Sequence, residues 1–115
     1  MTNSAESGRT GVFIGGALGD IAATMVVGAL AIRHRHASPL GMVSDQAPFA
    51  ALGLVPMDEL RFGGIDVRRG KLRDVARTVG DTSRTFSRDL LDAVAPTLDA
   101  IDADEIGRAS CRERV

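Results

Sequence analysis

The chain opens with an apolar run that changes character after five residues. Gly11-Val12-Phe13-Ile14-Gly15 is short, apolar and bounded by glycines, which is typical of a strand buried on both faces. From Gly19 or Asp20 to about Arg35 the apolar residues lie almost all round a helix, so we expect burial against a sheet or in a membrane. Between the two lies Gly15-Gly16-Ala17-Leu18-Gly19, which predicts a glycine-rich bend from strand to helix.

Two more strands are predicted further along. Gly41–Ser44 is interpreted as a second strand, with Asp45 at its end. Pro56–Leu60 suits one helical turn with a proline at its start. Phe62–Val67 is interpreted as a third short strand that contains or ends in a glycine turn.

The last part of the chain has the period of helices. Amphipathic helices are expected over Lys71–Val79 and from Ser87 to about Ala103. Ser87 is the expected N-cap of the second helix, and we expect Pro96 to divide that helix or to start a new one.

The composition of the chain excludes several classes of protein function. The chain has 115 residues, enough for one domain at most, and 14 Lys+Arg against 15 Asp+Glu give a net charge of −1. With four Phe, no Trp and no Tyr, it has neither the basic surface nor the aromatic platform of a nucleic-acid-binding protein. The single cysteine, Cys111, excludes an internal disulfide and a multi-cysteine zinc site. The pair His34-x-His36 is interpreted as a solvated helix end, because the two side chains point to different sides.

The two ends of the chain are set apart from the rest. Met1–Thr10 is expected to be a flexible leader. Residues 106–115 (Ile106–Val115) have no apolar period and resemble the conceptual translation of a common short-read sequencing adapter, so we expect a non-native tail. We therefore expect a single partial domain over residues 11–105. We also expect the reading frame to be cut near Glu105, so that the chain is an N-terminal fragment.

A membrane span is the main alternative for the first apolar segment. Gly11–Ile32 covers 22 residues with Asp20 as the only charge, near the length that a bilayer requires. However, an acid in mid-span costs about 2.5–3.5 kcal/mol on insertion scales, and five glycines lie within the segment. The leader carries Glu6 and lacks a cleavage site, which disfavours a signal peptide. We expect a cytoplasmic protein without a membrane partner, and keep a small membrane-anchored protein as the non-enzyme alternative.

The candidate chemistry is concentrated at the glycine-rich bend. Glycines let the chain turn tightly and let backbone N–H groups approach a pyrophosphate at a helix N-terminus. The pattern departs from G-x-G-x-x-G, since Ile14 occupies the first glycine position when Gly16 and Gly19 are taken as the other two. Asp20 would repel a phosphate unless it faces away. The alternative is a tight turn with no ligand.

Two acids are candidates for a ribose contact, because a carboxylate can accept hydrogen bonds from both hydroxyls of a diol. Asp45 follows the second predicted strand, 26 residues beyond Gly19. Asp66 ends the run Phe62-Gly63-Gly64-Ile65, where missing side chains would let a ligand lie against the backbone. For both, the alternative is a solvated turn residue.

Several segments together resemble the N-terminal cofactor segment of the myo-inositol-1-phosphate synthase family, closest to its shorter bacterial members. The resemblance covers roughly 11–105, and the loop and the double-glycine turn make it more specific than the bend alone. The matching residues are Gly15-Gly16-x-x-Gly19, Ala22-Ala23-Thr24, Gly28-Ala29-Leu30, Pro48-Phe49-Ala50-x-Leu52-Gly53-Leu54-Val55-Pro56 and Phe62-Gly63-Gly64-x-Asp66.

The resemblance implies an incomplete Rossmann-like parallel sheet, that is, an α/β N-terminal βαβ portion with C-terminal helices, which binds NAD. Members convert glucose 6-phosphate to inositol phosphate by oxidation, enolisation, aldol closure and reduction, in the cytoplasm and as homo-oligomers (tetramers). The cofactor-binding residues that it implies are Gly15, Gly16, Ala17, Leu18, Gly19 and Asp66.

Two departures qualify this implication. Phe13 occupies the family's first glycine position, and Ala17 and Leu18 stand where many members carry Asn, so we expect backbone contacts there. The family's catalytic lysines and substrate-phosphate site lie downstream of this chain, so no catalytic residue is assigned. Lys71 is expected to be a solvated surface residue. Alternatives are a fragment of another NAD(P)-dependent dehydrogenase and a free-standing nucleotide sensor.

Overall fold

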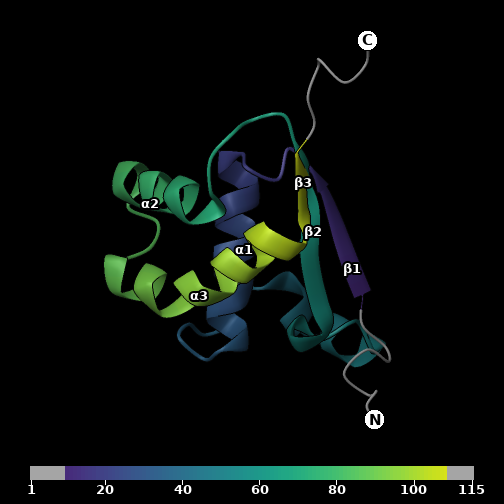
Figure 1. Cartoon of the computed structure of the whole chain (residues 1–115). Coiled ribbons are helices and arrows are strands. Elements are labelled where there is room, and N and C mark those ends of the chain that lie inside the picture. Colours follow the sequence, from purple (N-terminus) through teal and green to yellow (C-terminus); the bar gives the residue numbers. More distant parts are fainter. Residues whose placement is uncertain (1–9, 109–115) are drawn as a thin grey trace.

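Three parallel strands and the helices on one of their faces form the fold (Figure 1), in a computed structural model that describes residues 10–108. This confirms the predicted α/β class and its parallel sheet. The strands are β1 (Thr10–Gly15), β2 (Leu60–Asp66) and β3 (Ile106–Arg108), in the spatial order β1-β2-β3. The α-helices are α1 (Asp20–Arg33), α2 (Leu72–Ser83) and α3 (Arg88–Asp104).

The register of the strands places their carboxyl ends together. β1 pairs with β2 in parallel from Thr10 opposite Leu60 to Gly15 opposite Ile65. A parallel pair requires a crossover, and here α1 provides it, so the first half of the chain is a βαβ unit. The bend that follows β1 and the turn that follows β2 therefore leave the sheet at the same edge.

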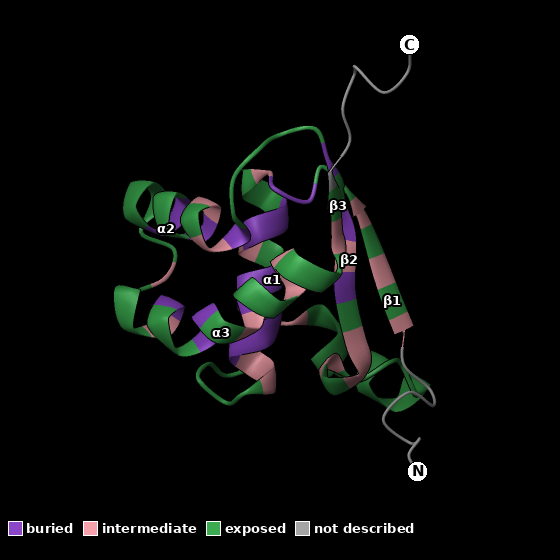
Figure 2. Cartoon of the chain, viewed as in Figure 1, coloured by how far each residue is buried: buried purple, intermediate pink, exposed green. Residues whose placement is uncertain are grey.

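Helices cover only one face of this sheet (Figure 2), and this corrects the predicted burial of the first strand on both faces. In β1, half-buried and exposed residues alternate, and Phe13 on the uncovered face is 76% exposed. α1 likewise leaves Ile21 and Met25 exposed, although most of its apolar residues are buried. The core consists of the residues between the sheet and the three helices, among them Leu18, Val27, Leu30, Phe62, Leu72, Val94 and Leu98.

The predicted second strand is wrong. Gly41 lies in a turn, and after Met42 a short 3-10 helix follows, η1 (Val43–Asp45), with Val43 64% exposed. Gly41 has a φ of +97°, which an extended strand does not contain, and the run is too short to bury an apolar face. Two further 3-10 helices follow, η2 (Phe49–Leu52) and η3 (Met57–Glu59), and the last confirms the predicted helical turn after Pro56.

Both later helices are confirmed. α2 runs to Ser83, four residues beyond its predicted end, and Ser87 caps α3 by accepting a hydrogen bond from the Leu90 N–H at 3.2 Å. Pro96 lies inside α3 without dividing it. A proline removes only one N–H donor from the helix, and the side chain of Pro96 is exposed, so the helix continues through it.

The end of the described chain joins the sheet. Ile106–Arg108, the first residues of the segment predicted to be a non-native tail, pair with β2 as β3. Pairing of backbone groups does not depend on the origin of the residues, so that origin stays a prediction. Thr10, the last residue of the predicted leader, begins β1. Residues 1–9, the rest of that leader, and residues 109–115, with Cys111, lie outside the described residues.

The first apolar segment is a strand, a bend and a helix of 14 residues. Within residues 10–108, none of the helices has both the length and the apolar character needed to cross a bilayer.

Candidate functional site at the glycine bend

The glycine-rich bend lies where the sequence predicts it, between the end of β1 at Gly15 and the start of α1 at Asp20. Gly16 has a φ of +87°, a left-handed conformation that costs a residue with a side chain about 1 kcal/mol or more. Gly19 is the N-cap of α1, and no side chain caps this helix end. The bend thus places the open end of α1 at the carboxyl edge of the sheet.

Asp66 lies against this bend. It is the last residue of β2 and only 6% exposed. Its Oδ2 accepts a hydrogen bond from the Leu18 N–H at 2.8 Å, and its Oδ1 accepts one from the Arg68 N–H at 2.8 Å. The structure therefore brings together the two parts of the site that the sequence predicts, although 48 residues separate Leu18 from Asp66.

A residue that the sequence analysis did not assign completes the arrangement. The Arg68 guanidinium donates from Nη1 to the Leu18 carbonyl at 3.1 Å, so it lies across the bend. A Cβ built on Gly19 would lie 3.5 Å from the same Nη1 atom. Leu18, Asp66 and Arg68 thus form a closed ring of hydrogen bonds. The signal for Arg68 is the basic turn Arg68-Arg69-Gly70 immediately after the strand.

The ring favours the ionised form of Asp66. The Arg68 N–H is the main cause that lowers the pKa of the Asp66 carboxyl below its ordinary value, while burial acts in the opposite direction. The Leu18 N–H, the positive charge of Arg68 and the Val67 N–H lower the pKa further. Asp66 is therefore a carboxylate at neutral pH, with its negative charge directed at the bend.

The donors of the bend are occupied within the chain. The N–H groups of Gly16 and Ala17 both donate to the Ile65 carbonyl, at 2.8 and 3.2 Å. The Gly19 N–H donates to the Gly16 carbonyl at 2.9 Å, and the Leu18 N–H is the one held by Asp66. The donors that the helix geometry leaves for a ligand at this edge are those of the first turn of α1.

There is space above the bend for a ligand. A Cβ built on Gly15 or Gly16 would have no atom within 4 Å, apart from its own chain neighbours. Gly15 is the last residue of β1 and is exposed, four residues before the bend ends at Gly19. A group that lies on these two glycines would contact bare backbone.

The double glycine of β2 has a different use. A Cβ on Gly64 would lie 2.0 Å from the Ile14 carbonyl oxygen, and one on Gly63 would lie 2.6 Å from the Glu105 carbonyl oxygen. The neighbouring backbones, and not a ligand, occupy the space that the missing side chains leave. These glycines let β2 pack closely between its neighbours and so place Asp66 at the bend.

The other candidates lie elsewhere. Asp45 is exposed in η1, and the segment 43–59 lies at the amino ends of the strands, away from the bend (Figure 1). His34 and His36 are exposed after the end of α1, and Lys71 is exposed at the N-cap of α2. In the described part of the chain, no three His, Cys, Asp or Glu side chains are grouped as a metal site would need.

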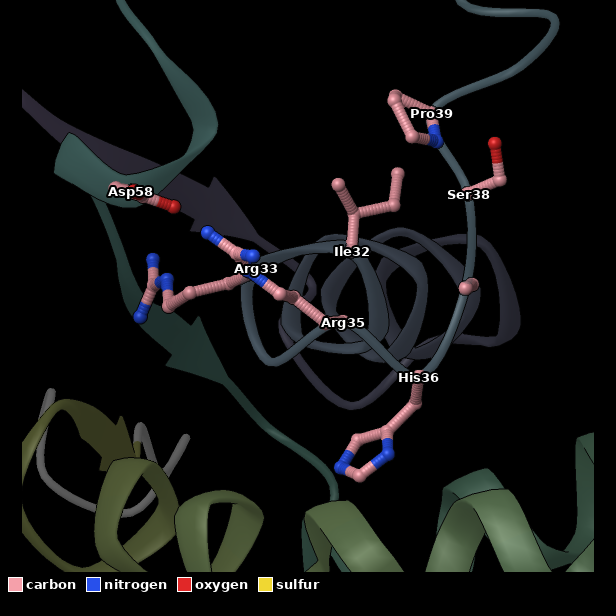
Figure 3. Close-up of a pocket in the computed structure, with 8 residues that line it drawn as sticks. Ile32, Arg33, Arg35, His36, Ser38, Pro39 and Asp58 are labelled. Atoms are coloured by element: carbon pink, nitrogen blue, oxygen red, sulfur yellow. The ribbon is translucent and has the colours of Figure 1, made fainter.

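A hollow of about 640 Å³ lies at the opposite end of α1 from the bend. Figure 3 shows the side chains of Arg33 and Arg35 extending there toward the segment that carries Asp58. Because α1 ends there with its carbonyl groups outward, the helix dipole opposes an anion at this place. The bend is therefore the better candidate for an anionic ligand.

Comparison with known proteins adds no assignment to this geometry. No protein-family model matches the chain, and a comparison with curated protein sequences finds no match either.

Proposed function

We propose that the chain binds NAD at the carboxyl ends of β1 and β2, as the nucleotide-binding part of an enzyme of the inositol-phosphate synthase type. The observation that carries the proposal is the ring of Leu18, Asp66 and Arg68, which joins the glycine bend to the end of the neighbouring parallel strand. In open parallel sheets, ligands bind outside the carboxyl ends of the strands.

The residues present fit a diphosphate in one particular way. Gly15 and Gly16 offer bare backbone under open space, and the first-turn N–H groups of α1, from Asp20 onward, point to the same edge. Ala17, Leu18 and Gly19 shape the bend, because their N–H groups donate within the chain. Arg68 adds a guanidinium beside the bend, a group that suits phosphate oxygens.

Asp66 holds the bend in shape in this proposal. A contact with a cofactor hydroxyl, which the sequence predicts for Asp66, stays a prediction. That contact requires one carboxylate oxygen to accept a further hydrogen bond, and each oxygen has a second lone pair for it.

The activity of the whole enzyme follows from the family resemblance. NAD would serve there as an acceptor and later donor of hydride, so that glucose 6-phosphate is isomerised to myo-inositol phosphate with no net redox change. We place this activity in the cytoplasm and in a homo-oligomer, on the same resemblance. None of the residues 10–108 is assigned a catalytic role.

Calorimetric titration of NAD into the full chain tests the binding. Gly15→Val is the informative variant, because the fold has room for the new side chain, which would cover the surface that the ligand needs. Gly11→Val is the matched control, since Gly11 lies on the same face of β1 and also has no atom within 4 Å of its Cβ position.

We expect the wild type and Gly11→Val to bind NAD with the same affinity. Gly15→Val should bind NAD at least about tenfold more weakly, a loss of about 1.4 kcal/mol in binding free energy. Circular dichroism melting should show equal stability of the two variants. A folded wild type that does not bind NAD, or equal affinity of Gly15→Val and Gly11→Val, would contradict the proposal.

A further inference from the structure

The Leu18 N–H is the one donor of the bend that is held by a charged group of the chain itself. Its acceptor, Oδ2 of Asp66, carries a negative charge at 2.8 Å, as an oxygen of a bound phosphate would. We propose that Asp66 is a specificity-determining residue, an internal anion that keeps small free anions out of the bend. The inference rests on the proposed nucleotide site and adds to it a rule for which ligands the bend accepts.

The hydrogen bonds to the Asp66 carboxylate hold it in place, so that it competes with a free anion for the Leu18 N–H. Both carboxylate oxygens accept backbone N–H groups, one from the bend and one from Arg68, and the side chain is 6% exposed. Hydrogen bonds from N–H groups to an ionised acceptor are about twice as strong as neutral ones. A free anion that takes the Leu18 N–H must break one of these bonds and leave the carboxylate without its partner.

The positive charge beside Asp66 does not outweigh the negative charges that a free anion meets at the bend. Arg68 is the cation in contact with the ring, and its guanidinium is directed at the Leu18 carbonyl. Asp20 is exposed in the first turn of α1 and adds a second negative charge at the same helix end. A small anion at the bend thus meets two carboxylates and one guanidinium.

A ligand succeeds here only if other parts of it supply binding energy. Inorganic phosphate and pyrophosphate have no groups other than their charged phosphates to contact the chain. The repulsion from Asp66 therefore lowers their binding free energy with no other contact to offset it. A dinucleotide adds two nucleosides, whose contacts offset the repulsion on its diphosphate. The ring therefore discriminates in favour of a dinucleotide over the free anions that share its linking group.

The variant Asp66→Asn tests this inference. The amide keeps the size of the side chain and one acceptor, and it removes the charge. Inorganic pyrophosphate is titrated into the wild type and the variant by calorimetry at low ionic strength, where screening is least. The control Asp20→Asn removes one negative charge from the same helix end without touching the ring.

We expect Asp66→Asn to bind pyrophosphate about tenfold more tightly than the wild type, as removal of a like charge at hydrogen-bond distance implies. Asp20→Asn should change the affinity by less than about threefold, the size of an exposed charge effect. Equal gains in both variants would show a general charge effect and overturn the inference, as would no gain in Asp66→Asn.

Titration of NAD into the same proteins separates this inference from the proposed function. If the wild type binds NAD and Asp66→Asn gains no pyrophosphate affinity, the nucleotide site stands and the competition is wrong. If no protein binds NAD but Asp66→Asn gains pyrophosphate affinity, the competition stands and the assignment of NAD is wrong. If no protein binds either ligand, both are wrong.

A measurement on the wild type covers the case in which Asp66→Asn does not fold. In an NMR titration of the wild type with pyrophosphate, we expect binding weaker than that of NAD, with the Leu18 amide and the Asp66 carboxyl carbon shifting together only at high pyrophosphate concentration. Pyrophosphate binding as tight as that of NAD, or binding that shifts neither resonance, would overturn the inference.

Discussion

The two ends of α1 are held to β2 by side chains of opposite charge. At the N-terminal end, the Asp66 carboxylate accepts backbone N–H groups of Leu18 and Arg68. At the C-terminal end, the Arg33 guanidinium donates to the backbone carbonyls of Met57 and Leu60, where β2 begins. Each charge complements the helix dipole at its end, and each satisfies backbone groups that regular secondary structure leaves over.

The two ends differ in burial. Asp66 is buried and accepts from the N–H of the buried Leu18, whereas Arg33 is half-buried and lines the open hollow of Figure 3. Carbonyl groups that lose a donor at an open site can accept a hydrogen bond from water, but buried N–H groups cannot find a new acceptor. The hydrogen bonds of Asp66 at the N-terminal end of α1 should therefore contribute more to the free energy of unfolding than those of Arg33 at its C-terminal end.

The largest effect is expected for Asp66→Ala. Two N–H groups lose their acceptor, so we expect the free energy of unfolding to fall by about 3 kcal/mol. Asp45→Ala, which removes an exposed acid outside the core, is the control and should cost less than about 0.5 kcal/mol. Urea unfolding followed by circular dichroism measures both, and similar losses would show that the ring contributes little.

A smaller effect is expected for Arg33→Ala. The Met57 and Leu60 carbonyls can be hydrated once the guanidinium is gone, so the loss should be about 1 kcal/mol by the same unfolding measurement. Arg35→Ala removes the neighbouring exposed cation and should change stability by less than about 0.5 kcal/mol. A loss for Arg33→Ala that equals the loss for Asp66→Ala would remove the contrast between the two ends.

The smallest effect concerns pH. Because the pKa of Asp66 is lowered in the folded chain, its contribution is complete above the unfolded value of about 3.9 and is lost as the pH falls through the folded value. The stability difference between the wild type and Asp66→Asn should thus be constant from pH 7 to pH 5 and shrink below about pH 4. Urea midpoints at pH 7, 5 and 3.5 measure it, and a difference that grows on acidification would contradict the lowered pKa.

The sequence predicts the elements whose signals are local. β1, the bend, α1, α2 and α3 each follow from a run of apolar residues, a glycine cluster or a cap within a few positions. The prediction of a second strand at Gly41–Ser44 is wrong because four residues, one of them a glycine, are too few to show an alternation of apolar and polar side chains. Pro96 predicts a break because proline lacks an N–H, but α3 continues through it, since buried residues on both sides of Pro96 pack against the core and the local signal does not contain that packing.

Contacts between distant residues are what the sequence could not supply. Asp66 was predicted from its place after the glycine pair, but its partner Leu18 depends on the register of β1 and β2. Arg68 was visible only as part of a basic turn. The glycines of β2 are predicted to make room for a ligand, whereas the close approach of two backbones explains them, that of Ile14 in β1 and that of Glu105 at the end of α3.

The uncovered sheet face has a practical consequence. Phe13 is 76% exposed there, and the chain has no Trp or Tyr, so it barely absorbs at 280 nm. A single indole placed at position 13 would be the only fluorophore of its kind in the molecule. Its emission would report whatever comes to lie on that side of the strands, without interference from the rest of the chain.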